Sequence, residues 1–438
     1  MKQINIGIVG MGTVGTGIAK LMEKNKDVIS ARLGAQLVFK KGADIDLERD
    51  RDITFAKDQL TTDPQAVTDD PDIAIVAEMI GGTGIAKEII TRAIENKKHV
   101  VTANKALLAE HGNELFELAA RKGVNIAFEP SVGGCMPIIK TIRETMVSNR
   151  IEAVTGILNG TCNYILTKIS NEGVAFADAL KDAQDKGYAE SDPTLDVDGF
   201  DTAHKLAIIN ALAYGMKINL NDIYIEGISE ITPMDIGFAR DCGYRIKLLA
   251  ISKFDDGAVQ ARIHPTMVPF SNQLSNVSGS MNAVTVTGDG TGDMILFGRG
   301  AGMLPTATAA LSDIADISRT IIDGGTVRVP MLSWQMNHIK EVPVRPIDDT
   351  HTHYYFRFTV IDRPGVLSKI AGILGRHDIS IKSVHQIERK LDGGVPLFML
   401  THKAKEAHVQ AAVKEISALE ISTREPVLIR IEESEHDL

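Results

Sequence analysis

The sequence predicts an α/β protein that begins with a doubly wound parallel sheet, continues into an α+β domain and ends in a small βαββαβ domain. Three observations support this fold class. Short apolar strands alternate with helical stretches over the first 130 residues, longer helices mix with strands from about residue 137, and a final strand and helix series follows a proline-rich segment. A chain of 438 residues also exceeds what one hydrophobic core usually supports, so several domains are expected.

The N-terminal sheet is predicted from apolar strands separated by helices with apolar residues at three- and four-residue spacing. The expected strands are 4–9, 37–39, 73–77, 100–101 and 126–128, and the expected helices are 13–22, 86–95 and 106–121. Later helices at 175–186 and 202–214 and strands at 248–254 and 284–288 indicate the α+β domain. A helix at 307–322 follows a glycine-rich turn and is expected to return to the first domain.

The C-terminal domain is expected beyond a linker that contains Pro330, Pro343 and Pro346. The strands 355–361, 379–386, 396–402 and 427–431, with helices 366–376 and 406–416, give a ferredoxin-like order. These patterns place domains at 1–136 plus about 300–325, at 137–299 and at 350–438. The motifs and the family resemblance described below make them a dinucleotide-binding domain, a catalytic and dimerisation domain, and a regulatory domain.

Composition limits the partners of the protein. Charged residues make up 24% of the chain and the net charge is −10, which argues against nucleic acid, because phosphate backbones require clustered lysine and arginine. No apolar run reaches membrane-spanning length, and a strand pattern begins at once at the N-terminus, so no membrane partner and a cytoplasmic location are expected.

The three cysteines, Cys135, Cys162 and Cys242, lack metal-type spacing and are expected to be reduced. Cys135 follows two glycines, so a nucleophilic thiol is one interpretation. A small buried side chain that fills space is the preferred one.

A glycine motif carries the first chemical prediction. Gly10, Gly12 and Gly15 follow the first strand, and Thr13 and Val14 open a helix. In this setting the glycines permit the turn, the approach of a pyrophosphate and close helix packing, while the helix N-terminus attracts phosphate. We predict a Rossmann-type domain that binds NAD or NADP, rather than a purely structural turn.

The end of the second strand bears on the choice between these cofactors, because an acid there binds ribose hydroxyls and an arginine accepts a 2′-phosphate. Asp44 and Asp46 occur later than the usual offset and follow Lys40 and Lys41. This mixed pattern favours NAD by a small margin.

Two lysines are candidates for the reacting site. Lys105 follows a strand at the sheet edge where open α/β proteins bind ligands, although a surface lysine in the first turn of a helix is the alternative. Asp201 and Lys205 are four residues apart on a predicted helix and hence on one face. Carbonyl reduction creates an alkoxide, which an ammonium group can stabilise and protonate. A solvated acidic segment with an ordinary ion pair is the alternative.

The segment from Glu129 to Pro137 follows the last strand of the first domain and is rich in glycine and proline. A tight turn there can present several backbone carbonyl oxygens, which suit a hard cation such as Na⁺ or Ca²⁺. A plain interdomain loop is the other interpretation.

Taken together, these segments resemble homoserine dehydrogenase over almost the whole chain. The motifs that carry the resemblance are Gly10-Met-Gly-Thr-Val-Gly15, Thr102-Ala-Asn-Lys105, Glu129-Pro-Ser-Val-Gly-Gly134, Gly156-Ile-Leu-Asn-Gly-Thr161, Gly187-Tyr-Ala-Glu190 and Asp201-Thr-Ala-His-Lys205. The resemblance implies NAD(P)-dependent interconversion of L-homoserine and L-aspartate 4-semialdehyde. Two positions depart from it: Ile45 stands where members often carry arginine, which weakens an NADP preference, and Cys162 stands where threonine is expected.

The resemblance also assigns roles to residues. It implies that Lys205 is the acid and base, that Glu190 and Asp201 bind the substrate, and that Lys105 lies between cofactor and substrate. Glu190 and Gly302 would also approach the cofactor. The cation, expected to be Na⁺, would be bound mostly by backbone oxygens of Glu129, Val132, Gly134 and Met136.

The C-terminal unit resembles an ACT domain, with its first turn at residues 362–367. The resemblance implies an amino-acid effector, for which threonine is the natural hypothesis, and a homodimer or homotetramer. A dimerisation module without a ligand is the alternative for this unit. For the whole chain the alternatives are another Rossmann dehydrogenase and an amino-acid-sensing binding protein with a vestigial dehydrogenase half.

Overall fold

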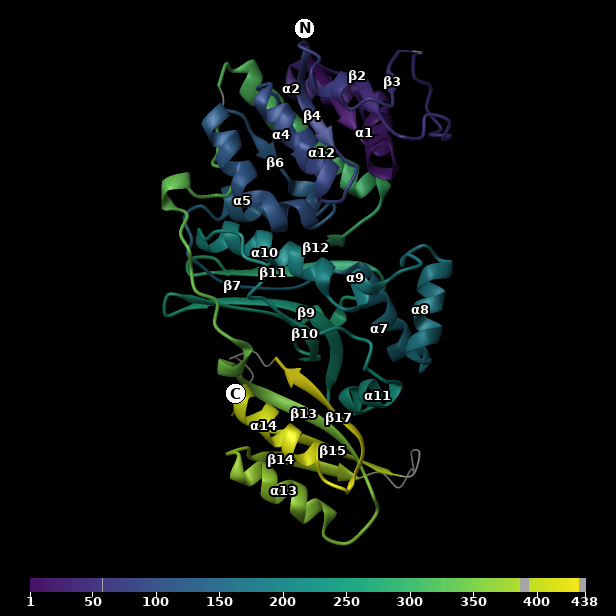
Figure 1. Cartoon of the computed structure of the whole chain (residues 1–438), viewed down its shortest axis with the longest axis vertical. Coiled ribbons are helices and arrows are strands. Elements are labelled where there is room, and N and C mark those ends of the chain that lie inside the picture. The colour runs from purple at the N-terminus through teal and green to yellow at the C-terminus, as the bar shows by residue number, and fades with distance from the viewer. Residues whose placement is uncertain (57, 326, 387–393, 433–438) are drawn as a thin grey trace. The chain divides into compact units, whose positions relative to one another are not determined.

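The computed structural model describes residues 1–56, 58–325, 327–386 and 394–432 (Figure 1). The chain divides into two compact units. Unit 1 comprises Met1–Val154, Asp201–Asn221 and Met281–Val342, and unit 2 comprises Thr155–Phe200, Asp222–Ser280 and Pro343–Leu438. This division into two units does not test the three predicted domains, whose boundaries stay a prediction.

Unit 1 contains the predicted doubly wound sheet. Its six strands are all parallel and lie in the order β3-β2-β1-β4-β5-β6. They are β1 (Lys2–Val9), β2 (Ala35–Ala43), β3 (Leu60–Thr61), β4 (Ile73–Glu78), β5 (His99–Thr102) and β6 (Ile126–Ala127). The strand order reverses between β1 and β4, and such a reversal is where open α/β sheets bind ligands.

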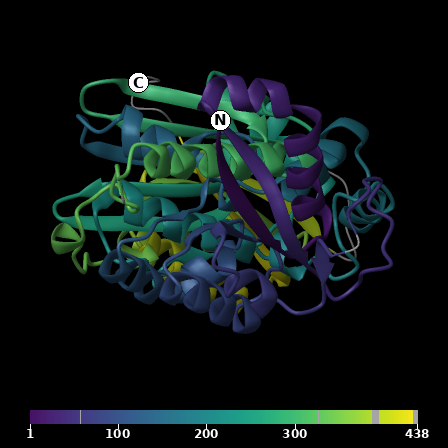
Figure 2. The same cartoon turned by 90° about the horizontal axis from the view of Figure 1, so that it is seen from above.

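Helices cover this sheet, and one of them comes from late in the sequence. The helices of unit 1 are α1 (Thr13–Lys24), α2 (Lys26–Leu33), α3 (Gln65–Thr68), α4 (Gly84–Glu95), α5 (Lys105–Lys122), α6 (Ile138–Lys140) and α12 (Met303–Ile322). Ile314 and Ala307 of α12 share a buried core with Ile18 of α1, and Figure 2 shows α12 in green beside the purple N-terminal strands. A Cβ on Gly17 would lie 2.9 Å from the Met303 side chain, so the small residue permits this close packing. The predicted return of this helix to the first domain is confirmed.

Short helical turns and one hairpin complete unit 1. They are η1 (Glu129–Ser131), η2 (Thr141–Thr145), η4 (Met336–His338), and the antiparallel pair β11 (Met281–Gly288) and β12 (Gly292–Arg299). The strand β7 (Ile151–Ile157) and the helix α10 (Phe200–Tyr214) include residues on both sides of a boundary between the units.

Unit 2 contains the predicted βαββαβ order at its C-terminal end, with the two-residue strand β16 added. The elements are β13 (His351–Val360), α13 (Val366–Arg376), β14 (Ile381–Gln386), β15 (Val395–Thr401), β16 (Ala404–Lys405), α14 (Glu406–Ser417) and β17 (Ser422–Ile431). The remaining elements of the unit are α7 (Gly160–Glu172), α8 (Phe176–Asp185), α9 (Thr194–Val197), β8 (Tyr224–Ile225), α11 (Pro233–Asp241), β9 (Tyr244–Asp255), β10 (Ala258–Pro269), η3 (Gln273–Asn276) and η5 (Ile347–Asp349). The sequence patterns did not predict α7 or β10.

Strand pairing and buried ion pairs join the C-terminal elements to the rest of unit 2. β17 pairs in parallel with β10, so the C-terminal sheet continues the β9–β10 hairpin. The Asp235 carboxylate of α11 accepts hydrogen bonds from Arg357 Nε at 2.7 Å and from the Tyr355 hydroxyl at 2.6 Å. Arg430 of β17 binds Glu406 at 2.6 Å and Glu226 at 2.8 Å. Breaking a buried pair of this kind costs about 3–5 kcal/mol, so these contacts hold the C-terminal elements in place.

Two details differ from the sequence predictions. β2 continues to Ala43, well past the expected end at residue 39, because its pairing with β1 resumes after an irregularity at Lys40. Lys40 itself is bound by Asp70 and Asp72 at 2.9 and 2.7 Å. The expected linker is also partly paired, since Val259 of β10 donates its N–H to the Pro343 carbonyl at 2.9 Å. Among the described residues, no helix has the length and apolar character to cross a bilayer.

Candidate active site

The glycine turn lies at the carboxyl end of β1, and steric contacts explain two of its glycines. Gly10 has a φ of +94°, and a Cβ on it would lie 2.6 Å from the backbone of Met79. A Cβ on Gly15 would lie 2.0 Å from the carbonyl oxygen of Gly10. The helix α1 begins at Thr13 and directs its first N–H groups to the space above Gly12. The residues predicted to bind phosphate therefore lie together and fit a dinucleotide.

Beside this turn is a cleft of about 200 Å³, lined by residues such as Val14, Gly81 and Asn104. Glu78, at the end of β4, is completely buried beneath it and accepts hydrogen bonds from the N–H of Ile80 at 2.8 Å and the hydroxyl of Thr102 at 2.7 Å. Burial raises the pKa of Glu78. Sequence reasoning missed this residue, although an acid that ends an apolar strand is a signal that could have found it.

The central feature of unit 1 is a carboxylate that binds two ammonium groups. Asp201 Oδ2 lies 2.6 Å from Lys205 Nζ, and Asp201 Oδ1 lies 3.2 Å from Lys105 Nζ. The side chains of Asp201 and Lys205 are 9% and 10% exposed, whereas that of Lys105 is 38% exposed. The structure thus brings together three of the predicted site residues from two distant parts of the sequence.

The helices that carry these lysines are held together at a second point. Asn113 of α5 donates to the Ile218 carbonyl and accepts from the Ile218 N–H, both at 2.9 Å. Trp334 donates its indole N–H to the Leu212 carbonyl of α10 at 2.9 Å. The first contact joins α5 to the segment that follows α10, and the second joins α10 to the segment that carries Trp334. Asn104 caps the N-terminus of α5, where Lys105 lies.

The predicted cation loop is folded around a buried acid. The two carboxylate oxygens of Glu129 accept hydrogen bonds from the N–H groups of Ile139 and Lys140, each at 2.9 Å. Burial, together with the nearby charge of Asp313, raises the pKa of Glu129 to about 8, and burial raises that of Asp313 to about 6. Because both carboxylate oxygens of Glu129 already accept hydrogen bonds, its backbone carbonyl is the group that could bind a cation.

This loop contacts the late glycine turn. A Cβ on Gly134 would lie 2.5 Å from the Gly300 backbone, and the Cys135 N–H donates to the Arg299 carbonyl at 3.3 Å. Gly302, with a φ of +123°, precedes α12. Cys135 itself is exposed, so the prediction of a buried filler is wrong. The backbone at Gly134 packs closely against Gly300, and the side chain of the next residue, Cys135, faces solvent.

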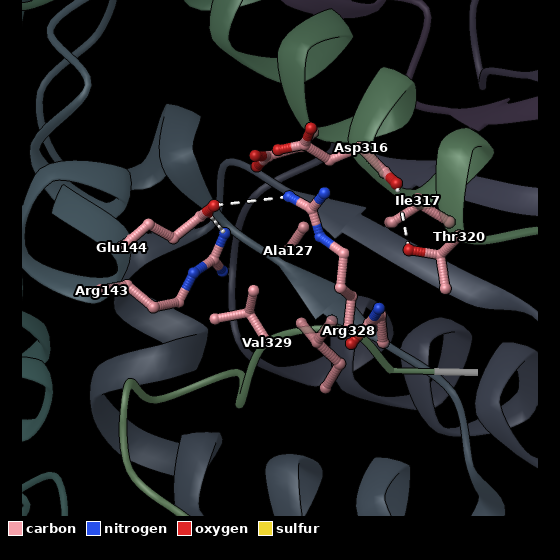
Figure 3. Close-up of a pocket in the computed structure, with 11 residues that line it drawn as sticks. Ala127, Arg143, Glu144, Asp316, Ile317, Thr320, Arg328 and Val329 are labelled. Carbon is pink, nitrogen blue, oxygen red and sulfur yellow. Dashed lines mark hydrogen bonds and ion pairs between the residues drawn. The ribbon is translucent and has the colours of Figure 1, made fainter. Parts of the chain in front are cut away.

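A second pocket near this loop does not compete as a substrate site. Figure 3 shows Glu144 directed at both Arg143 and Arg328, with Nη2 to carboxylate distances of 2.8 and 3.6 Å. The cavity has a volume of about 40 Å³, which is room for only one or two water molecules. Charged side chains therefore line this cavity, and it is too small to bind the substrate.

Glu190 belongs to unit 2, in an exposed segment organised by the N-terminus of α7. Thr161 donates to the Tyr188 carbonyl at 2.7 Å, and Asn159 donates to Asp196 at 2.6 Å. The Cys162 thiol lies 3.1 Å from the Asp196 carbonyl oxygen. Nothing in the structure explains why cysteine stands here in place of threonine, because a threonine hydroxyl could donate to the same carbonyl. Sequence reasoning did not connect Asn159 to this segment.

The fold and this site define a class of protein. A dinucleotide-binding turn at the switch point of a doubly wound sheet, beside paired ammonium groups on one carboxylate, is the arrangement of an NAD(P)-dependent dehydrogenase.

Comparison with known proteins gives the particular family. Family models described as homoserine dehydrogenase, its NAD-binding domain and the ACT domain match residues 137–315, 10–129 and 354–421. The homoserine dehydrogenase of Neisseria gonorrhoeae is 43% identical over 437 residues, which cover all of both chains. The chain therefore belongs to the homoserine dehydrogenase family and is an oxidoreductase with an NAD-binding domain and an ACT domain. This full-length similarity does not favour a binding protein with a vestigial dehydrogenase half.

Solved structures agree with this assignment. A homoserine dehydrogenase from Thiobacillus denitrificans has a TM-score of 0.93 and 42% identity, with 99% of each chain covered. A mutant of a hyperthermophilic archaeal homoserine dehydrogenase in complex with NADPH has a TM-score of 0.62 and 25% identity, with 74% of this chain and all of that chain covered.

The buried Glu129 predicts a pH-dependent stability. Its folded pKa of about 8 exceeds the ordinary value of 4.5. The stabilisation from protonated Glu129 is therefore complete below pH 4.5 and is lost as pH rises toward 8. Between pH 5 and pH 8.5 the free energy of unfolding of the wild type should fall by on the order of a few kcal/mol relative to that of Glu129→Gln, which cannot ionise. Thermal melting of both proteins measures this difference. For the exposed control Glu110→Gln, the difference in Tm from the wild type should be the same at every pH. The same behaviour in Glu129→Gln would contradict the prediction.

Proposed function

We propose that Lys205 transfers the proton in the interconversion of L-homoserine and L-aspartate 4-semialdehyde, with Asp201 and Lys105 beside it. The observation that carries this proposal is the Asp201 carboxylate between the two ammonium groups. The trio has a net positive charge, which favours the oxygen of a carbonyl as it becomes an alkoxide. NAD(P), when bound at the glycine turn, would supply or accept the hydride.

Burial distinguishes the two lysines. Lys205 is far more buried than Lys105, and its hydrogen bond to Asp201 fixes the position of its ammonium group, so we assign the proton transfer to Lys205. The more exposed Lys105 would orient the substrate oxygen and the cofactor. From the family resemblance we further propose that Glu190 and Asp201 bind the substrate and that Glu190 and Gly302 approach the cofactor.

Substitution of Lys205 tests the proton transfer. Lys205→Ala should lower kcat by about 100-fold or more, the usual contribution of a positioned acid or base, while the Kd for the cofactor stays unchanged. Lys205→Arg keeps the charge but cannot release a proton, so it should be equally slow. The control Lys217→Ala removes an exposed lysine near the end of α10 and should leave kcat unaltered. Loss of cofactor binding in Lys205→Ala would count against the proposed role.

We also propose a monovalent cation, Na⁺, bound mainly by the backbone oxygens of Glu129, Val132, Gly134 and Met136. Within the described residues, no hydrogen bond reaches the carbonyl oxygen of Val132 or Gly134. Both oxygens therefore remain for a cation, and they lie next to the turn that carries Gly302.

The reaction and the cation can be tested together. Purified protein mixed with L-homoserine should reduce NAD or NADP, as followed by absorbance, and activity should fall when Na⁺ is replaced by tetramethylammonium. Other small hydroxy acids serve as control substrates and should be poor. Equal rates with those substrates would shift the assignment to another dehydrogenase, and indifference to Na⁺ would remove the cation.

We propose threonine as the effector of the ACT domain and a homodimer or homotetramer as the working assembly. Ile295 and Phe297 are 37% and 60% exposed on β12, which is an edge strand, and such apolar edges are typical of subunit interfaces. Millimolar threonine should inhibit the reaction, and an unchanged rate would refute threonine as the effector.

Sedimentation should give a mass above that of one chain, and a mass equal to one chain would refute the proposed assembly. We also propose a cytoplasmic location, which cell fractionation tests.

A further inference from the structure

The loop that follows β2 is held against the glycine turn by one buried arginine. Arg51 is 5% exposed, and its Nε donates to the Met11 carbonyl at 2.9 Å. Its Nη1 donates to the Arg49 carbonyl at 2.9 Å, and its Nη2 donates to the Asp46 carbonyl. A single guanidinium therefore binds both the phosphate-binding turn and the loop, so the loop has a defined position before any ligand arrives.

The two acids of this loop are used to fold it. Asp44 Oδ1 accepts the N–H of Asp46 at 3.0 Å, and Asp44 Oδ2 lies 3.6 Å from Arg51 Nη2. Asp46 Oδ1 accepts the N–H of Arg49 at 3.0 Å. These acids were the reason to expect NAD, because an acid at the end of β2 binds ribose hydroxyls. With Asp44 neutralised by Arg51 and Asp46 bonded to the backbone, that reason is weakened.

The guanidinium of Arg49 lies near the second glycine of the turn. A Cβ on Gly12 would have one neighbour within 4 Å in the described structure, Arg49 Nη1 at 3.9 Å. The residue is exposed, and its guanidinium has no ion pair with any described residue. Lys40, another cation near the end of β2, is already bound by Asp70 and Asp72.

We propose that Arg49 binds the 2′-phosphate of NADP(H) and makes this enzyme prefer NADP(H) over NAD(H). This inference rests on the proposed binding of a dinucleotide at the glycine turn. The N–H groups of α1 serve the pyrophosphate, whereas the adenosine ribose is bound where β2 ends, and the loop that carries Arg49 begins there. A planar guanidinium pairs with phosphate through two hydrogen bonds. The Arg51 contact holds the backbone of Arg49 in place, which lowers the entropic cost of binding.

Direct binding measurements test the proposal without relying on turnover. The Kd of wild type and Arg49→Ala would be measured by calorimetry for NADPH, NADH, 2′,5′-ADP and 5′-ADP. Arg49→Ala should weaken NADPH and 2′,5′-ADP by about 10- to 100-fold, the usual range for a charged hydrogen-bonded pair, and should change NADH and 5′-ADP by less than about 3-fold. The control Lys24→Ala removes an exposed charge at the end of α1 and should alter none of the four.

Each other outcome overturns the assignment. An equal loss for NADPH and NADH would place Arg49 at the pyrophosphate, and unchanged binding of all four probes would remove it from the cofactor site. Tighter binding of NADH than NADPH by the wild type would refute the preference itself. Because a dinucleotide can bind an inactive enzyme, failure of the Lys205 prediction would leave this result interpretable, whereas failure to bind any of the four probes would refute the dinucleotide site itself.

Discussion

The site depends on one carboxylate, Asp201, that accepts two ammonium groups. Lys105 begins a helix of the dinucleotide-binding fold, and Lys205 lies one helical turn after Asp201 on α10. Two positive charges this close would repel each other, and an unpaired charge at such burial would be costly. Asp201 removes both problems and still leaves a net positive charge for a substrate oxygen. The Asn113–Ile218 contact joins α5 to the segment that follows α10, and so helps to hold Lys105 near Asp201.

Around this site, buried ionisable side chains bind the backbone of loops and take no part in the proposed reaction. Glu78 binds the backbone after β4, Glu129 binds the start of α6, and Arg51 binds the carbonyls of two loops. In each case a polar side chain replaces the water that a loop would otherwise need for its backbone. The shifted pKa of Glu129 follows from that role, so an altered pKa in this protein does not by itself identify a reacting group.

The ACT domain is part of a continuous sheet in unit 2. Because β17 pairs with β10 and Arg357 binds Asp235 at the start of α11, the domain cannot move freely relative to these elements. A ligand that displaced β13 would have to move α11 with it or break a buried ion pair, at about 3–5 kcal/mol. An effector site there is thus mechanically connected to the helices and strands around it.

The sequence by itself determined the doubly wound sheet, the βαββαβ order and the glycine turn, because alternation, helical spacing and glycine position are local signals. It also placed Asp201 and Lys205 on one face of a helix. Only the tertiary structure decided that Lys105 joins them, that Glu78 lies beneath the cleft, and that Cys135 is exposed. The same holds for Asp44 and Arg49: their separation from the glycines in sequence says nothing about which side chain Arg51 neutralises and which one lies over Gly12. Contacts between distant segments are set by packing and charge pairing, which a local pattern does not contain.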